Sequence, residues 1–454
     1  MKRFMTTLFT VVLLAAALCV GASASDFDAV AEDLSSIGMF RGTASGFELD
    51  RAPTRSEAAI MLVRLYGAEE EANADYAAGK ISHPFTDVSA FTSPYVAWLY
   101  TNGITNGYTA TTYASQKPCS TQNYAVFLLR ALGYKDGQDF QYADALTFAQ
   151  EKGFYDPTMF AGTFLRDDLA ALTYQALAAD MADGSTYLLD SLIKDGAIDA
   201  EAAAPMTEKI ELYRAMTAAT DTEDASAMDM DMTMKMDMTL GYAGESETMS
   251  TNVTGSIQVD AADPQNVKMS ANMSYDLLGQ TVKMGEWMKD GYVYISMDDS
   301  TEKTAYKYAV PDQIAALQSL EAVDVSAMDV SGLAMIDSIS EKDGVYTVVI
   351  GKAMAGYMNE ALSALSDQEI TADVDMNDIT MTVTTDRSGK MKAMTMAFGM
   401  AMQMEVEGEV FDVAYDYDVA VSIKATGSKV KVTFPGNLSS FEEISLEEAL
   451  AIEG

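Results

Sequence analysis

The sequence predicts two different folded parts in one chain: an all-α bundle of three repeats, followed by a mainly antiparallel β domain of the α+β class. Two observations predict this division. The first is a change of period, because core-type residues recur at helical spacing up to about residue 216 and alternate with polar residues from Met228 onward. The second is an internal repeat in the first half, which is typical of units that bury their apolar faces against each other.

The first 24 residues, 1–24, are predicted to be a signal peptide. Lys2 and Arg3 precede a short apolar run, and Ala22-Ser23-Ala24 has the small-residue pattern of a cleavage site. We therefore expect the mature protein to begin at Ser25 and to be secreted.

The composition excludes several classes of function. The formal net charge of -39 argues against binding to nucleic acid, whose phosphates carry the same sign. His83 is the one histidine, so a histidine-rich metal site is excluded, and we expect His83 to be a loop residue. After cleavage Cys119 is the one cysteine, so no intrachain disulfide can form. No cofactor is predicted.

One segment occurs three times, at residues 53–67, 119–133 and 164–177. The first two copies align without a gap at an offset of 66 residues. In each copy the core-type residues recur at i, i+3, i+4 and i+7, which predicts an amphipathic helix. These residues are Ala58, Met61, Leu62 and Leu65; Tyr124, Phe127, Leu128 and Ala131; and Leu169, Leu172, Thr173 and Ala176.

The three helix starts differ. Thr54 and Glu57 have the spacing of a capping box. The second copy keeps an N-cap at Ser120 but has Asn123 in place of the glutamate. The third copy has Leu165 at the cap position, so we expect its cap to be lost or replaced.

Several short motifs accompany these helices. They are Phe85-Thr86-Asp87-Val88, Trp98, Gly103-Ile104, Gly107-Tyr108 and the helix start Thr54-Arg55-Ser56-Glu57. Together they resemble the S-layer homology (SLH) domain, whose signature is Thr-Arg-Ala-Glu. The resemblance covers residues 25–182, with repeats at about 26–75, 84–135 and 138–180.

The resemblance implies a pseudo-threefold bundle that docks on an anionic secondary polymer of the bacterial cell wall, often one with a pyruvyl ketal. In this family the arginine of the signature meets the negative group. Physically, a guanidinium at a helix N-terminus adds charge to the helix dipole and matches a carboxylate in two hydrogen bonds. The protein would then be located at the cell surface.

The signature arginine is Arg55, and Arg166 occupies the same position in the third copy. The second copy has Thr121 there, so one of the three grooves should be weak toward an anion. The candidate glycan-binding residues are Arg55, Thr54, Glu57, Arg166 and Trp98.

Each of these candidates has a structural alternative. Arg55 could be a solvated residue of the first helical turn. Asp167 and Asp168 could neutralise Arg166. We expect Trp98, on a short helix, to belong to the core unless it offers a platform to a ligand.

Residues 183–226 are predicted to connect the two parts. Residues 187–193 and 208–216 have the pattern of short amphipathic helices, separated by 197–205. Residues 217–227 are small and acidic, and we expect a linker there.

Residues 227–454 are predicted to form a methionine-rich antiparallel β domain. Residues 228–238 alternate apolar and polar, which predicts a long half-buried strand, and similar strands follow. Asp290-Gly291 predicts a hairpin turn. Two helices, near 311–320 and 352–365, are expected to cover the concave side of a curved sheet.

The first strand carries Met228, Met230, Met232, Met234, Met236 and Met238. These methionines have three interpretations. They are adaptable core filler, or they line a plastic apolar cavity for a lipid, or they form a thioether copper(I) site. The copper site is disfavoured because side chains at i and i+2 on a strand lie about 6.6 Å apart and no histidine or cysteine assists.

The alternating first strand, the long meandering strands, the two expected covering helices and the ending Val432-Thr-Phe-Pro435 also resemble half-barrel lipoprotein carriers of the LolA and LppX/LprG types. This resemblance implies a half-barrel that binds an acyl chain or another apolar ligand. No catalytic residues come with it.

We therefore expect a secreted cell-surface protein that its repeats anchor to a wall polymer. Its β domain is expected to bind a lipid or another apolar ligand. No catalytic motif is found, so an enzyme is not expected. Two alternatives stay open: an anchored hydrolase, and a structural envelope protein whose repeats do not bind polymer.

Overall fold

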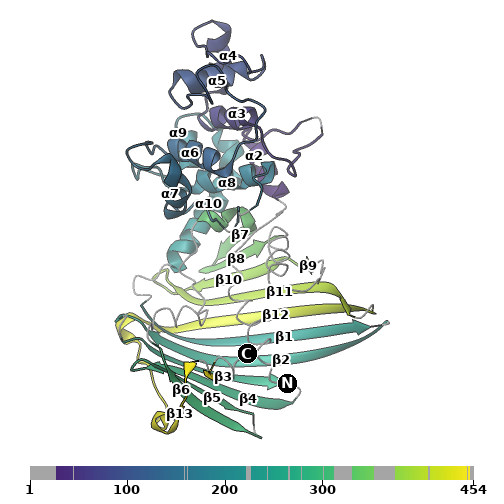
Figure 1. Cartoon of the computed structure of the whole chain (residues 1–454), viewed down its shortest axis with the longest axis vertical. Helices are drawn as coiled ribbons and strands as arrows, with labels where there is room; N and C mark the ends of the chain where they lie inside the picture. The colour runs from purple at the N-terminus through teal and green to yellow at the C-terminus, as the bar shows by residue number, and fades with distance from the viewer. Residues whose placement is uncertain are drawn as a thin grey trace.

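The structure is a computed structural model, and it describes residues 27–449 except 44, 158, 161, 221–225, 243, 264–265, 278, 300, 311–329, 352–373, 407–408 and 447. The predicted signal peptide and the two predicted covering helices lie outside the described residues. Within them, helices occupy the first part and a single large sheet the second, as Figure 1 shows. This arrangement confirms the predicted fold class.

The helical part is built from short helices that pack around one apolar core. Their bounds are α2 Asp28–Ser36, α3 Arg55–Leu65, α4 Glu69–Ala77, α5 Ser93–Thr101, α6 Thr121–Ala131, α7 Ala145–Glu151, α8 Arg166–Ala178, α9 Leu188–Lys194 and α10 Ala200–Thr220, with a 3-10 turn η1 at Tyr142–Asp144.

Helices α3, α6 and α8 are the three copies of the predicted repeat helix. Each begins at the same repeat position, and α6 contacts both α3 and α8. The stripes predicted to face the core are buried in all three. The copies are therefore clustered, as a repeat module requires.

The connector agrees with the prediction in part. The first predicted helix, 187–193, is observed as α9, Leu188–Lys194. The second is longer than predicted, because α10 begins at Ala200 inside the expected separator and contains Pro205. Residues 217–220, predicted to begin the linker, form its last turn, and Thr220 is 3% exposed. The burial of Ile210, Tyr213 and Met216, together with the high helix preference of the alanines before Pro205, outweighs the cost of that proline.

The described residues of the second part form a sheet of 13 strands. Their bounds are β1 Ala227–Tyr242, β2 Glu245–Asp260, β3 Lys268–Leu277, β4 Gln280–Lys289, β5 Tyr292–Asp298, β6 Lys303–Ala309, β7 Ile336–Lys342, β8 Val345–Ile350, β9 Val374–Met376, β10 Ile379–Thr385, β11 Met391–Val406, β12 Glu409–Thr426 and β13 Glu442–Glu443. The order is β13-β6-β5-β4-β3-β2-β1-β12-β11-β10-β8-β7, with β9 paired to β11.

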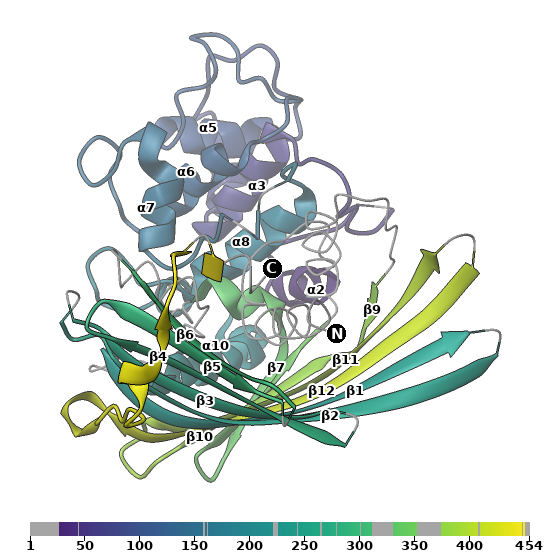
Figure 2. The same ribbon diagram turned by 60° about the horizontal axis from the view of Figure 1, so that its bottom comes forward.

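The described strand pairs are antiparallel, except that the short β13 runs parallel to β6. Asp290 and Gly291 have φ of 52° and 80° and join β4 to β5, so the predicted hairpin turn is confirmed. Figure 2 shows that the sheet is open and strongly curved.

The alternation of β1 places its methionines on one face. Met230 lies between Ile257 of β2 and Ile423 of β12, whereas Asp231 lies between two serines on the other face. Met234 and Met236 are each 3% exposed. The sequence period thus predicts which side of the strand is apolar.

The helical part packs against the β7 edge of the sheet. Helix α8 contacts a 3-10 turn, η3 (Val330–Met335), and α10 contacts β7. Gln175 of α8 donates a hydrogen bond to the carbonyl of Ser331, and Leu333 is fully buried. Ile336 at the start of β7 is therefore buried against the helical part, whereas five of the seven residues of this edge strand are exposed.

Candidate anion-binding seams of the helical repeats

The starts of α3 and α8 each lie against a loop of another repeat, in the same way. The backbone N–H of Arg55 donates to the carbonyl of Lys117 at 2.9 Å, and that of Arg166 donates to the carbonyl of Arg51 at 2.9 Å. Residues 51 and 117 are separated by the repeat offset of 66. We call these equivalent places the Arg55 seam, with the loop 113–118, and the Arg166 seam, with the loop 47–52.

The two guanidinium groups are also held alike. Arg55 donates from Nε to the carbonyl of Tyr113 at 2.9 Å, and Arg166 donates from Nε to the carbonyl of Phe47 at 2.9 Å. Each lies over an aromatic ring, at 5.0 Å for Arg55 on Tyr113 and 4.9 Å for Arg166 on Phe40. The repeat symmetry therefore extends to the signature arginines.

In the Arg166 seam the cation is neutralised. Arg166 Nη1 lies 2.9 Å from Glu57 Oε1, and its side chain is 5% exposed. Arg51 pairs with the same Glu57 at 2.6 Å and with Glu48 at 3.1 Å. The partner of Arg166 is thus Glu57, from another repeat, rather than the adjacent Asp168, whose carboxylate accepts from the Leu165 N–H at 2.7 Å.

The acids at this helix position titrate differently. Burial disfavours the Glu57 carboxylate, but Arg51, the Thr54 N–H and Arg166 together outweigh burial and lower the pKa of Glu57 to about 2. Asp168, at the same position of α8, is half-buried, and the Leu165 N–H only partly offsets the loss of solvation of its carboxylate. Its pKa is raised to about 6.

In the Arg55 seam the cation has no such partner. The position equivalent to Glu57 in the facing repeat is Asn123, 66 residues further on. Among the described residues, no carboxylate oxygen lies within 4.0 Å of Arg55. The other described arginines of the helical part each have one within 3.1 Å, and they are Arg41, Arg51, Arg64, Arg130, Arg166 and Arg214.

Asp87 orders the loop of the Arg55 seam. Its carboxylate accepts backbone N–H groups from Tyr113 and Ala114, both at 2.7 Å, and from Ser115 at 3.3 Å. Burial would raise the pKa of Asp87, but these donors hold it below its ordinary value. The Asp87 carboxylate therefore binds the backbone of this loop, and it orients the Tyr113 carbonyl that accepts the Arg55 hydrogen bond.

The N-terminal caps of the three repeat helices are those predicted from the sequence. Thr54 Oγ1 accepts from the Glu57 N–H at 3.2 Å and Glu57 accepts from the Thr54 N–H at 2.8 Å, so the capping box is confirmed. Ser120 accepts from the Asn123 N–H at 3.3 Å. Leu165 has no side-chain acceptor and the Asp168 contact replaces the cap, as expected.

The last candidate, Trp98, and the equivalent helix start at Thr121 contact other parts of the helical bundle. Trp98 on α5 is half-buried, and its ring centre lies 5.6 Å from that of Tyr66, against the core. Thr121 starts α6 at the arginine position, next to Gln122, which donates to the Tyr142 carbonyl at 2.5 Å. Whether the groove at this helix start binds an anion stays a prediction.

Asp87, Lys117 and the role of Asn123 were not found from the sequence. The Asn-for-Glu replacement at 123 was visible there. Its meaning was not, because it depends on the equivalent Glu57 pairing with an arginine of another repeat rather than of its own.

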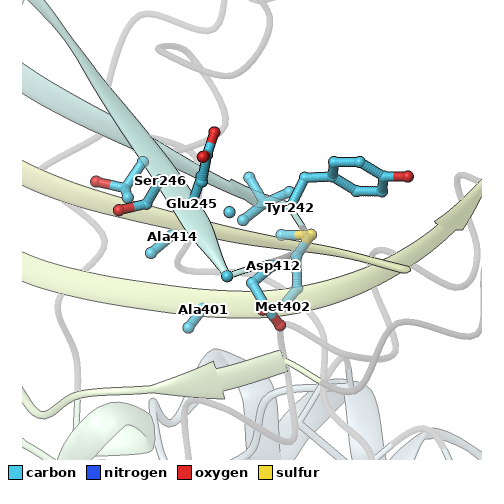
Figure 3. Close-up of a pocket in the computed structure, with 11 residues that line it drawn as sticks. Tyr242, Glu245, Ser246, Ala401, Met402, Asp412 and Ala414 are labelled. Atoms are coloured by element: carbon cyan, nitrogen blue, oxygen red, sulfur yellow. The ribbon is translucent and has the colours of Figure 1, made fainter. Parts of the chain in front are cut away.

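The apolar cavity predicted around the β1 methionines stays a prediction, because the two predicted covering helices lie outside the described residues. The hollow in Figure 3 measures about 480 Å³ and lies at the ends of β1, β2, β11 and β12. Tyr242, Glu245, Met402 and Asp412 line it, and none of the six β1 methionines does. Met232 and Met234 instead border two other open hollows, of about 620 and 380 Å³.

Two further classes of site were sought in the described residues. No group of three or more histidine, cysteine, aspartate or glutamate side chains there could hold a metal ion. In the same part of the chain, no helix has both the length and the apolar character needed to cross a bilayer.

Comparison with known families identifies the class of the second repeat. Residues 84–120 match the family described as "S-layer homology domain". The predicted resemblance is therefore confirmed for this repeat. No curated protein matches the chain in sequence.

Among solved structures, LprF from Mycobacterium bovis is similar at 11% identity, over 51% of this chain and 98% of that one, with a TM-score of 0.24. The ywiB protein from Bacillus subtilis matches at 10% identity, over 42% and 92%, with a TM-score of 0.13. A putative outer membrane lipoprotein-sorting protein domain from Vibrio parahaemolyticus matches at 9%, over 50% and 94%, with a TM-score of 0.13. Scores this low carry no argument about function.

Proposed function

We propose that the helical repeats attach this secreted protein to an anionic secondary polymer of the cell wall, and that the Arg55 seam is the anion seat. The match of residues 84–120 to an S-layer homology domain supports the location at the cell surface. The observation that carries the residue assignment is the Arg55 guanidinium, which alone among the described arginines of the helical part has no carboxylate beside it.

The Arg166 seam indicates what such a seat accepts. There, the Glu57 carboxylate lies 2.9 Å from a guanidinium held in the same geometry. A carboxylate of the polymer, such as a pyruvyl group, would take the equivalent place on Arg55. The positive end of the α3 helix dipole adds to the attraction, and charge-assisted hydrogen bonds from a guanidinium contribute about 1.5–3 kcal/mol each.

The test is co-sedimentation of the full mature chain with purified sacculi that retain their secondary polymer, against sacculi stripped of it. We expect binding to the first only. Arg55→Ala should weaken binding about tenfold or more, since it removes the charged donor, and Thr121→Ala should change it far less. The proposal fails if the chain stays in the supernatant, or if the two variants behave alike.

For the β domain we propose that its apolar face binds a lipid or another apolar ligand. The supporting observation is that Met228, Met230, Met232 and Met238 share that face and are only half-buried, while methionine adapts readily to varied apolar shapes. No catalytic step is part of this proposal. Native mass spectrometry of the full chain purified from cells should show a bound lipid. A ligand-free protein that also ignores fluorescent fatty-acid probes would contradict it.

A further inference from the structure

Tyr108 is a large aromatic residue that stays 61% exposed beside the Arg55 seam. The ammonium nitrogen of Lys117 lies 4.1 Å from the centre of its ring. The carbonyl of the same Lys117 accepts the backbone N–H of Arg55 at 2.9 Å. Lys117 therefore links the exposed ring directly to the start of α3.

The ring of Tyr108 is carried on a rigid turn. The Tyr108 N–H donates to the Thr112 carbonyl at 2.8 Å, and the Thr109 and Thr112 hydroxyls lie 2.6 Å apart. Gly107 has φ of +78°, and a Cβ there would lie 2.2 Å from the Phe85 ring, so the backbone is seated against this side chain. An exposed aromatic on a fixed backbone loses little conformational entropy when a ligand binds.

The Arg166 seam has no such ring. The position equivalent to Tyr108 is Gly42, where a Cβ would lie only 2.9 Å from the Gly46 carbonyl oxygen. The equivalent of Lys117 is Arg51, which is paired with Glu57 and Glu48. The exposed aromatic and the additional cation thus occur at the seam whose arginine lacks a carboxylate.

Among the described residues, Lys117 also has no carboxylate oxygen within 4.0 Å. The Arg55 seam therefore combines two cations with an exposed ring on a chain whose net charge is strongly negative. A pyranose that carries an acid matches this combination, because its C–H face is apolar and its acidic group is an anion. Aromatic rings pack on such apolar faces while cations bind the acid.

We propose that Tyr108 and Lys117 form a saccharide subsite next to the anion seat, in which a sugar ring of the polymer packs on Tyr108 while its acidic group is bound by Arg55. This inference rests on the proposed function and deepens it, since it assigns the residues that bind the sugar ring beside the acidic group of the polymer. Lys117 orients the ring and provides the second positive charge.

The experiment compares two probes on the full mature chain by titration: oligosaccharide fragments released from the polymer, and sodium pyruvate. The variants are Tyr108→Ala, Tyr108→Phe and Arg55→Ala. The matched control is Phe91→Ala, since Phe91 is 71% exposed and lies in the same repeat. Thermal unfolding of every variant confirms that the fold is kept.

We expect Tyr108→Ala to weaken fragment binding about three- to tenfold and to leave pyruvate binding unchanged, whereas Tyr108→Phe keeps the affinity for both. Arg55→Ala should weaken both probes. If Arg55→Ala abolishes fragment binding but Tyr108→Ala matches Phe91→Ala, the saccharide subsite is overturned and the anchoring function stands. If the fragments do not bind even the unaltered chain, both ideas are overturned.

Discussion

The Arg55 and Arg166 seams are built from the same repeat and hold their arginines with the same backbone contacts, yet one arginine is neutralised and the other is not. The repeat position that supplies the neutralising carboxylate is Glu57 in one facing repeat and Asn123 in the other, and Asn123 accepts a hydrogen bond from Tyr142. A signature arginine is thus paired within the protein, or left without a carboxylate, according to a residue of a different repeat.

The same helix position behaves in three ways in one molecule. Glu57 is paired with two arginines, Asn123 is neutral, and Asp168 is a half-buried carboxyl with one backbone donor. Because the three residues occupy the same repeat position, each is a control for the others. Exchanging them tests whether the charge at this position determines the stability of a seam and its binding of an anion.

The largest effect is expected from Glu57→Gln. It leaves the buried Arg166 without a carboxylate and Arg51 with Glu48 alone, and breaking a buried pair in this way costs about 3–4 kcal/mol of unfolding free energy. Trp98 fluorescence during urea unfolding, in a Trp287→Phe background, reports on the helical part. Glu70→Gln, at an exposed position of α4, is the control and should change little. A loss of unfolding free energy below about 0.5 kcal/mol would mean that the ion pairs of Glu57 do not stabilise the Arg166 seam.

The pH dependence sharpens this prediction. The pKa of Glu57 falls from 4.5 to about 2 on folding, so its contribution is fully present above about pH 4.5 and is lost as the pH falls toward 2. Because the group is partly solvated, we expect about 2 kcal/mol from this term. The acid limb of the stability profile should be flatter in Glu57→Gln than in the unaltered chain.

The next effect concerns binding. Asn123→Glu should give the Arg55 seam the carboxylate that the Arg166 seam already has, and a self-neutralised arginine no longer attracts the polymer. We expect sacculus binding to fall about tenfold or more, with Asn123→Gln as the neutral control. If Asn123→Glu binds sacculi as well as the unaltered chain does, the residue at position 123 does not control whether Arg55 can bind an anion.

The smallest effect is a stabilisation. The pKa of Asp168 rises from 3.8 to about 6 on folding, so this group favours the folded state at low pH and that benefit is lost as the pH rises through 6. Asp168→Asn keeps an acceptor for the Leu165 N–H without the charge. We expect a gain of about 1–2 kcal/mol at pH 7 and almost none at pH 4. A loss at pH 7 would show that the charged form is stabilised instead.

The elements of the fold were largely predictable from local pattern. The helical period located α3, α6 and α8, and the alternation of Met228 to Met238 located the long first strand and its apolar face. The connector was predictable in part, since its first helix is observed as α9. The start of α10 was not predicted, because Pro205 disfavours a helix locally, and the alanines around it together with the burial of Ile210 and Tyr213 offset that cost.

By itself the sequence determined the repeat, the capping box at Thr54 and Glu57, and the position of Arg55 at a helix start, because each depends on neighbours within one helical turn. Only the tertiary structure decided which residue faces each arginine. Glu57 reaches Arg166 across 109 positions of chain, and Asn123 stands at the equivalent place in the Arg55 seam. Electrostatic pairing acts through space at a few ångströms, so the charge of each seam follows from how the repeats pack and not from their order along the chain.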